Sequence, residues 1–479
     1  MKNFEIRKTK IVATIGPACD SLDTLKEMIR AGMSVARLNL SHGTLAEQRE
    51  RLERVRQAGA QLDANIAIMI DTRGIEIRTG TLAVQPVELV SGDRFTLYTD
   101  PRQGDQHGVS VSFRKLAENV RYGTVILLDD GAIELRVQSV NEGEIECQVV
   151  HGGLLRDRKS VNLPDTRLAI ALVDPCYLEG LVEELDFACA TGADYIAASF
   201  VQNAGDIAQI RELLAERNCE IPIIAKIENR EGVANLDAII AVADGLMVAR
   251  GDLGVELPLA DVPGTQKQMI RKTVTAGKPV ITATQMLASM ETNPRPTRAE
   301  ASDVANAILD GTSAVMLSGE TAVGKYPIAA VRTMATLALR AESHLREFGY
   351  LQTILPNPSN VITEAVSQAA VAMANQLNAT AIFSLTATGF TSRLVSKHRP
   401  GCPILAITAS EPVARRLAMN WGVLPILYQG ARSDEAKVEF GIERARQLGY
   451  LDAGDIVVAT AGQREQAGGT DLIKVMTLV

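Results

Sequence analysis

The residues best suited to chemistry in this chain stand at the ends of short apolar runs. One run closes with Lys226 and Glu228, and the next passes into a turn that carries Asp252. Side chains two apart on a strand share a face, so Lys226 and Glu228 point the same way. An ammonium beside two carboxylates suits an anionic substrate and Mg²⁺, which usually takes one or two carboxylates plus substrate oxygens. Taken alone, Lys226 and Glu228 also fit a structural ion pair.

Oxygen-bearing side chains end two earlier runs and form a second cluster. Asn39 and Ser41 close one run, and Asp71 and Thr72 close the next. With a single formal charge, this set suits a monovalent cation better than Mg²⁺, although ordinary hydrogen bonding at the rim is an equal alternative. Arg37 shares a face with Asn39 and is a candidate for binding phosphate or carboxylate.

The runs that carry these side chains predict buried parallel strands, because they are short and rich in Val, Ile and Ala. Helical patterning follows nearly every one, and eight β-then-α units form a (β/α)8 TIM barrel with its chemistry at the strand ends. Thr284 and Ser318, at the ends of the last two runs, are therefore expected at the same mouth. The eight runs cover residues 10–16, 34–42, 65–71, 194–200, 222–228, 245–252, 278–284 and 312–320.

The barrel pattern is interrupted once and is followed by a second domain. Residues 74–162 alternate short β segments with glycine turns, which predicts an inserted all-β, barrel-like lid over the mouth. A surface insertion without a role is the alternative. The barrel then takes residues 1–73 and 163–348. Residues 356–360 are typical of a linker, and residues 356–479 alternate helix and strand as in a doubly wound α/β domain.

In that last domain, a strand-to-helix turn has the composition of a phosphate-binding site. Hydroxyls, a glycine and an arginine at a helix N-terminus favour an anion, although an ordinary turn is the simpler interpretation. The residues are Thr386, Thr388, Gly389, Thr391, Ser392 and Arg393.

Composition excludes several classes of protein. A net charge of −8 argues against a nucleic-acid binder. Six scattered cysteines without a CxxC pair argue against a disulfide framework or zinc site. There is no phosphate-loop motif, protein-kinase signature, GxSxG or HExxH. We see neither a signal peptide nor about 20 consecutive apolar residues, and so expect a cytoplasmic protein that does not bind membranes.

The chain closely resembles the pyruvate kinase family over essentially its whole length. The motifs stand in order at the expected strand ends. They are KIVATIGP (10–17), ARLNLSHG (36–43), DTRGIEIRTG (71–80), AKIENREGV (225–233), ARGDLGVELP (249–258), ATQML (283–287), PRPTRAEASDVANA (294–307) and MLSGET (316–321).

The resemblance implies transfer of phosphate from phosphoenolpyruvate to ADP, giving ATP and pyruvate. Lys226 and Arg37 would neutralise the moving phosphoryl group, while Glu228 and Asp252 would bind Mg²⁺ or Mn²⁺. The substrate carboxylate would be held by the backbone of Ala249, Arg250 and Gly251 together with Thr284. Asp252 would also belong to the substrate-binding residues. Thr284 and Ser318 would support proton transfer to the enolate carbon.

Further roles also follow from the resemblance. Asn39, Ser41, Asp71 and Thr72 match the K⁺ site, and Glu76 stands where K⁺-dependent members carry an acidic residue. His42, Arg78 and Lys159 would contact the nucleotide. A sugar-phosphate or nucleotide effector would bind residues 386–393, and the family is typically homotetrameric.

The chain departs from the family pattern around the lid. Arg73 and Ile75 replace the usual Lys and Pro, and Ser160 stands where Gly is common. Two other functions share part of this pattern: a Mg²⁺-dependent lyase acting on pyruvate enolate, and a catalytically silent sensor of phosphorylated metabolites. The lyase would not need the lid or the K⁺ cluster, and the sensor would not need Lys226, Glu228 and Asp252.

Overall fold

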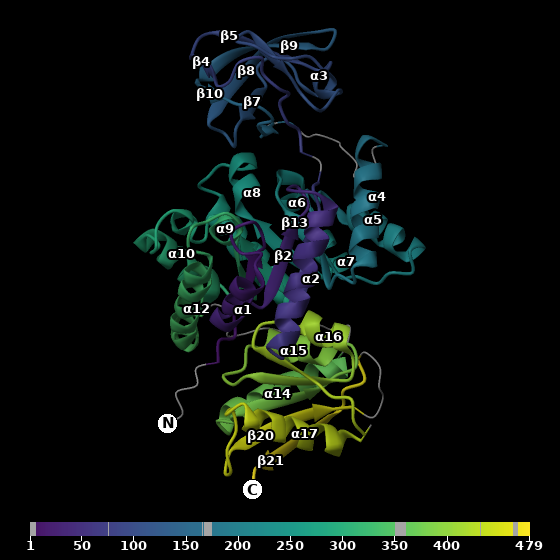
Figure 1. The fold of residues 1–479 in the computed structure, drawn as a ribbon. Helices are drawn as coiled ribbons and strands as arrows, with labels where there is room; N and C mark the ends of the chain where they lie inside the picture. Colours follow the sequence, from purple (N-terminus) through teal and green to yellow (C-terminus); the bar gives the residue numbers. More distant parts are fainter. Residues whose placement is uncertain are drawn as a thin grey trace.

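The computed structural model describes residues 6–74, 76–164, 166, 175–349, 361–431, 433–462 and 468–479. The predicted linker at 356–360 and Ile75 lie outside these residues. In Figure 1 the lid lies at one end of the barrel and the C-terminal domain at the other.

Eight parallel strands close into a barrel in the order β1-β16-β15-β14-β13-β12-β3-β2. Each lies within one of the eight predicted runs, which confirms the TIM-barrel prediction. All their residues are buried except Asn39, which is half-buried. The strands are β1 (Lys10–Thr14), β2 (Val35–Asn39), β3 (Ala67–Asp71), β12 (Tyr195–Ala198), β13 (Ile223–Ile227), β14 (Gly245–Ala249), β15 (Val280–Ala283) and β16 (Ala314–Leu317).

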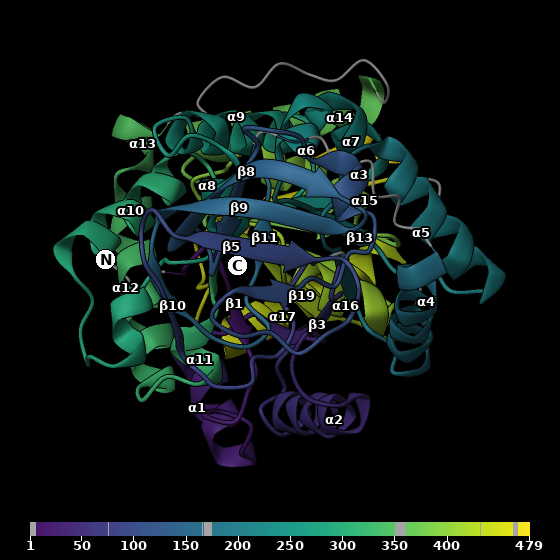
Figure 2. The ribbon, with the colours of Figure 1, turned by 90° about the horizontal axis from the view of Figure 1, so that it is seen from above.

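Helices surround this barrel (Figure 2). Several begin at capping boxes in which a side-chain oxygen accepts a backbone N–H of the first turn, as at Thr44 and Thr297. The helices are α1 (Leu22–Ala31), α2 (Leu45–Gln61), α4 (Pro175–Ala190), α5 (Ala204–Glu216), α6 (Arg230–Ala234), α7 (Leu236–Val242), α8 (Arg250–Glu256), α9 (Val262–Thr275), the 3₁₀ helix η1 (Ala288–Glu291), α10 (Arg298–Leu309), α11 (Gly319–Ala322), α12 (Pro327–Ser343) and α13 (Leu345–Phe348).

The lid is a β unit with one short helix, α3, and its own apolar core, and Figure 2 shows its strands lying over the barrel. Its main sheet has the order β11-β7-β8-β9-β5-β6, and β10 pairs with β4. The elements are β4 (Val87–Leu89), β5 (Arg94–Tyr98), β6 (Gly108–Ser110), α3 (Leu116–Asn119), β7 (Val125–Leu128), β8 (Ile133–Asn141), β9 (Glu144–His151), β10 (Gly153–Leu155) and β11 (Val161–Asn162).

The C-terminal unit is an α/β sheet of order β19-β18-β17-β20-β21, parallel except for β21. Its helices α15 and α16 face the barrel in Figure 1. The elements are α14 (Val361–Gln376), β17 (Ala381–Leu385), α15 (Phe390–Lys397), β18 (Ile404–Thr408), α16 (Glu411–Leu417), β19 (Val423–Leu427), α17 (Asp434–Gln447), β20 (Ile456–Ala461) and β21 (Leu472–Thr477). Among the described helices, none has the length and apolar character needed to cross a bilayer.

Candidate active site

A buried Lys226 ammonium lies at the centre of the barrel mouth. Its Nζ donates hydrogen bonds to Asp71 Oδ1 at 2.9 Å and to Ser199 Oγ at 2.7 Å. Asp71 is also bound through Oδ2 by Arg37 Nε at 2.6 Å. The Asp71 carboxylate thus holds two cationic side chains, those of Arg37 and Lys226. The sequence predicts both of these side chains for an anion-binding site.

The charges in this cluster stabilise one another. Burial alone would lower the pKa of Lys226, but the carboxylates of Asp71 and Glu228 raise it above its ordinary value. Burial would raise the pKa of Asp71, yet Arg37 and Lys226 together hold that pKa below its usual range. Lys226 therefore remains an ammonium and Asp71 a carboxylate at neutral pH.

Glu228 lies next to Lys226, and the Asp252 carboxylate interacts electrostatically with both. Glu228 Oε1 is 3.1 Å from Lys226 Nζ, and Glu228 Oε2 accepts the Phe200 N–H at 2.6 Å. Burial and the Glu228 charge raise the pKa of Asp252 to about 7. Within the described chain, no three His, Cys, Asp or Glu side chains gather as a self-sufficient metal site. Two carboxylates that repel each other beside an anion site fit Mg²⁺, which draws its remaining ligands from substrate and water.

The first residues of α8, directly after β14, lie against the end of β15. Thr284 Oγ1 accepts the Gly251 N–H at 2.7 Å and donates to the Ala283 carbonyl at 2.6 Å. Thr284 and Gln285 both have positive φ, of 65° and 54°, a strained conformation that is concentrated at functional sites. The hydroxyl of Thr284 is thereby aimed at the 249–251 backbone.

The guanidinium of Arg250 points back into the protein. It donates to the Thr284 carbonyl at 2.7 Å and to Asp303 Oδ2 at 2.6 Å. This direction of the side chain leaves the Arg250 backbone, the only part that the resemblance assigned to the substrate, beside Thr284.

Ser318 follows β16, and its buried hydroxyl has no hydrogen-bond partner within the described part of the chain. Its N–H donates to Glu320 Oε2 at 2.7 Å, which fixes the backbone of the turn. A buried hydroxyl without a partner is costly and is suited to meeting a ligand.

Ser199 is a site residue that the sequence reasoning missed. Its hydroxyl accepts from Lys226 and lies 2.6 Å from the Thr72 carbonyl, to which it donates. The only available signal was its place near the end of the fourth predicted strand, since a single serine there has no distinctive spacing.

Comparisons with known proteins show the family of the chain. The family model of the pyruvate kinase barrel domain matches residues 6–331, and that of the pyruvate kinase alpha/beta domain matches residues 364–476. A pyruvate kinase from Bacillus licheniformis is 46% identical over 473 residues, which is 98% of this chain and 80% of the relative. Another, from Clostridium acetobutylicum, is 43% identical over 476 residues, covering 99% of this chain and 100% of the relative.

The chain belongs to the pyruvate kinase family. It is a transferase enzyme, and the fold and resemblance predicted from the sequence are confirmed.

The residues that the family resemblance assigned to K⁺ meet at the ends of β2 and β3. Asn39 pairs with Asp71 across the two strands. Asn39 Oδ1 accepts the Ser41 N–H at 3.1 Å, and Thr72 Oγ1 accepts the Ser199 N–H at 3.1 Å. The set is rich in oxygen and carries one formal charge, so its donors fit a monovalent cation.

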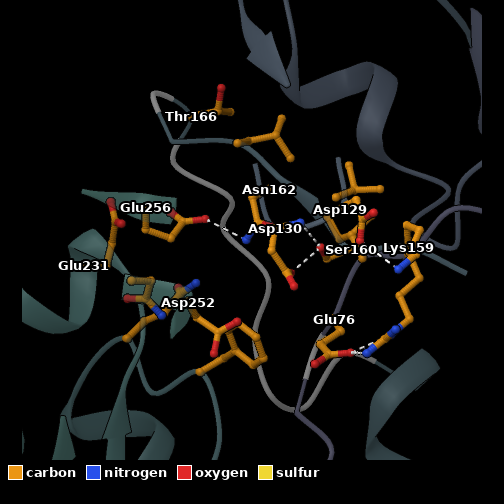
Figure 3. A pocket seen from close by; sticks show the side chains of 17 residues that line it. Glu76, Asp129, Asp130, Lys159, Ser160, Asn162, Thr166, Glu231, Asp252 and Glu256 are labelled. Atoms are coloured by element: carbon orange, nitrogen blue, oxygen red, sulfur yellow. Dashed lines mark hydrogen bonds and ion pairs between the residues drawn. The ribbon is translucent and has the colours of Figure 1, made fainter. Parts of the chain in front are cut away.

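A polar cavity of about 200 Å³ lies between lid and barrel (Figure 3). Arg78 and Lys159, two of the three nucleotide residues expected for a pyruvate kinase, line it together with Asp252. Arg78 Nε is bound to Glu76 Oε2 at 2.6 Å, and Lys159 Nζ to Asp129 Oδ1 at 2.8 Å. The third, His42, is exposed just after β2 and does not line this cavity.

A second cavity, of about 540 Å³, lies in the C-terminal domain. Thr386, Thr388 and Thr391 line it, together with Tyr428 and Lys437. The remaining predicted effector residues lie around it rather than in its lining.

These remaining residues shape or flank the turn. Gly389 has φ of 83°, and its N–H donates to Thr386 Oγ1 at 2.9 Å. Ser392 is buried against Ser384. Arg393 lies with its guanidinium carbon 5.9 Å from the centre of the Phe390 ring.

Proposed function

We propose that this protein transfers phosphate from phosphoenolpyruvate to ADP, forming ATP and pyruvate, in a reaction that depends on Mg²⁺ and K⁺. The observation that carries the proposal is the Lys226 cluster: a buried ammonium and a guanidinium share Asp71, next to Glu228. Such a cluster suits an anion whose charge must be neutralised while it moves.

Lys226 and Arg37 supply the electrostatic part of the reaction. A phosphoryl group in transfer is loosely bonded, and catalysis depends mainly on position and on charge stabilisation. Both cations are already held by Asp71, so neither has to reorganise when substrate arrives.

Glu228 and Asp252 would hold Mg²⁺ or Mn²⁺, and Asn39, Ser41, Asp71 and Thr72 would hold K⁺. The divalent ion supplies Lewis-acid polarisation of the phosphoryl oxygens when bound. Glu228 is positioned for this role by Lys226 and by the Phe200 amide, which contact its two carboxylate oxygens.

The remaining groups orient the substrate and move a proton. The backbone N–H groups at 249–251 and the Thr284 hydroxyl would bind the phosphoenolpyruvate carboxylate. Ser318, whose buried hydroxyl is unpaired within the described chain, and Thr284 would deliver a proton to the enolate carbon. Arg78 and Lys159, with His42, would bind the nucleotide beneath the lid.

Regulation and assembly form the finer part of the proposal. The 540 Å³ cavity beside residues 386–393 would take a sugar-phosphate or nucleotide effector that activates the enzyme. A homotetramer located in the cytoplasm follows from the same family resemblance.

The test is pyruvate formation from phosphoenolpyruvate and ADP with Mg²⁺, measured first in K⁺ and then in Na⁺ only. We expect fast turnover that collapses without K⁺. Turnover that is indifferent to K⁺ would leave the reaction standing and remove the K⁺ site. No turnover, even with sugar phosphates or AMP added, would favour a catalytically silent sensor.

A further inference from the structure

A buried carboxylate outside the reaction site binds the point where the chain leaves the barrel for the lid. Glu184, on α4, is only 2% exposed. Its Oε2 accepts the backbone N–H of Arg73 at 3.2 Å, and its Oε1 lies 3.2 Å from Arg73 Nε. Burial raises the pKa of Glu184 to about 7, and the contacts with Arg73 work against this rise.

The contact joins the outgoing connection of the lid to helix α4 of the barrel. Arg73 follows β3 by two residues, at the outgoing connection, and α4 is the first helix after the chain returns to the barrel. In Figure 1, α4 stands beside the barrel just below the lid. A single carboxylate therefore fixes the outgoing chain against the returning helix.

Arg73 is tied in turn to the residues around the reaction site. Its Nε also donates to the Leu40 carbonyl at 2.8 Å, next to Asn39. The backbone carbonyl of the preceding residue, Thr72, accepts a hydrogen bond from the Ser199 hydroxyl, and that hydroxyl also contacts Lys226. A shift of Arg73 would therefore change both the base of the lid and its alignment with the barrel.

We propose that Glu184 is a positioning residue that sets how the lid approaches the barrel, and through it how tightly the nucleotide is held. Glu184 acts by holding Arg73, not by touching substrate. The kinetic part of this inference rests on the proposed function, whereas the structural part does not.

The test compares Glu184→Ala and Glu184→Gln with Glu183→Ala, which removes the exposed carboxylate next along the helix. Measurements at pH 8 keep Glu184 ionised in the unmodified enzyme, because pH 8 lies above its pKa of about 7. The readouts are KM for ADP, KM for phosphoenolpyruvate, and hydrogen exchange of the Arg73 amide.

We expect Glu184→Ala to raise KM for ADP about tenfold, the effect of losing a charged hydrogen bond, and to leave KM for phosphoenolpyruvate within about twofold. The Arg73 amide should exchange faster. The KM for ADP and the exchange rate of Glu184→Gln should lie between those of Glu184→Ala and the unmodified enzyme, because an amide oxygen still accepts the Arg73 N–H. Glu183→Ala should match the unmodified enzyme in all readouts.

Equal rises in both KM values would overturn the inference, since they would mean a general disturbance of the barrel. So would an unchanged KM for ADP with unchanged exchange. If Glu184→Ala does not fold, Glu184→Gln decides by the same three readouts. If the unmodified enzyme forms no pyruvate, the proposed function fails, and exchange of the Arg73 amide alone still decides the role of Glu184.

Discussion

At the scale of single residues, the site depends on carboxylates that each serve two partners. Asp71 binds Arg37 and Lys226, and Glu228 binds Lys226 and the Phe200 amide. Period-two spacing predicted Lys226 and Glu228 because strand geometry alone places them on one face. It could not predict the direction of the Arg250 side chain, which depends on Asp303 from a different helix.

Glu76 gives the residue-scale prediction. It lines the cavity between lid and barrel. Its charge also helps to raise the pKa of Asp252, although burial and the charge of Glu228 contribute more to that rise. A lysine there would bring a fixed positive charge into an acidic region, in place of a bound monovalent cation. We expect Glu76→Lys to be active in Na⁺ buffer without K⁺, as measured by pyruvate formation. If the variant still needs K⁺, Glu76 is not the determinant.

At the scale of elements, the eight barrel strands could be predicted because each is a short run buried on both faces. The lid strands β5, β7, β8 and β9 could also be predicted. The others could not, because β4, β6, β10 and β11 are two or three residues long. The edge strand β21 has no buried pattern to predict it from, since most of its residues are exposed.

The connection from β3 to the lid gives the element-scale prediction. Gly74 has φ of 70°, and a Cβ there would lie 2.5 Å from the Ser199 Cβ and 2.6 Å from the Phe200 ring. We expect Gly74→Ala to lower the thermal midpoint through about 1–3 kcal/mol of strain and crowding.

Gly123→Ala is the matched control for that variant. Its φ is 85°, but a Cβ there meets nothing within 4 Å, so it carries the backbone cost without the crowding. Equal losses of stability in the two variants would show that the close packing at Gly74 is unimportant.

At the scale of the whole molecule, the C-terminal domain closes the end of the barrel opposite the lid. Ala418 and Met419 pack in the same apolar cluster as inward-facing strand residues such as Met69 and Met247. Beside them, Asp194 Oδ1 is bound by Arg415 Nε at 2.9 Å. The sequence predicted a separate C-terminal domain but not this contact, because the contact joins residues more than two hundred positions apart.

Met419 gives the whole-molecule prediction. It is fully buried, so Met419→Ala should cost about 2–5 kcal/mol and lower the unfolding midpoint. Denaturant unfolding followed by fluorescence of Trp421, the chain's single tryptophan, reports directly on this region. Met373→Ala, at a residue that is 38% exposed, is the control. A midpoint shift no larger than that of the control would mean that Met419 does not join the domains.

The most direct test of the central claim is phosphate transfer by Lys226→Met. Transfer from phosphoenolpyruvate to ADP should be followed by ³¹P NMR with Mg²⁺ and K⁺ present, together with binding of Mn²⁺ and phosphoenolpyruvate. Because Lys226 supplies charge to the moving phosphoryl group, kcat should fall by several decades, of the order of 10³-fold, while both ligands still bind. A near-normal kcat would contradict the account, because phosphoryl transfer would then not depend on the ammonium at the centre of the site.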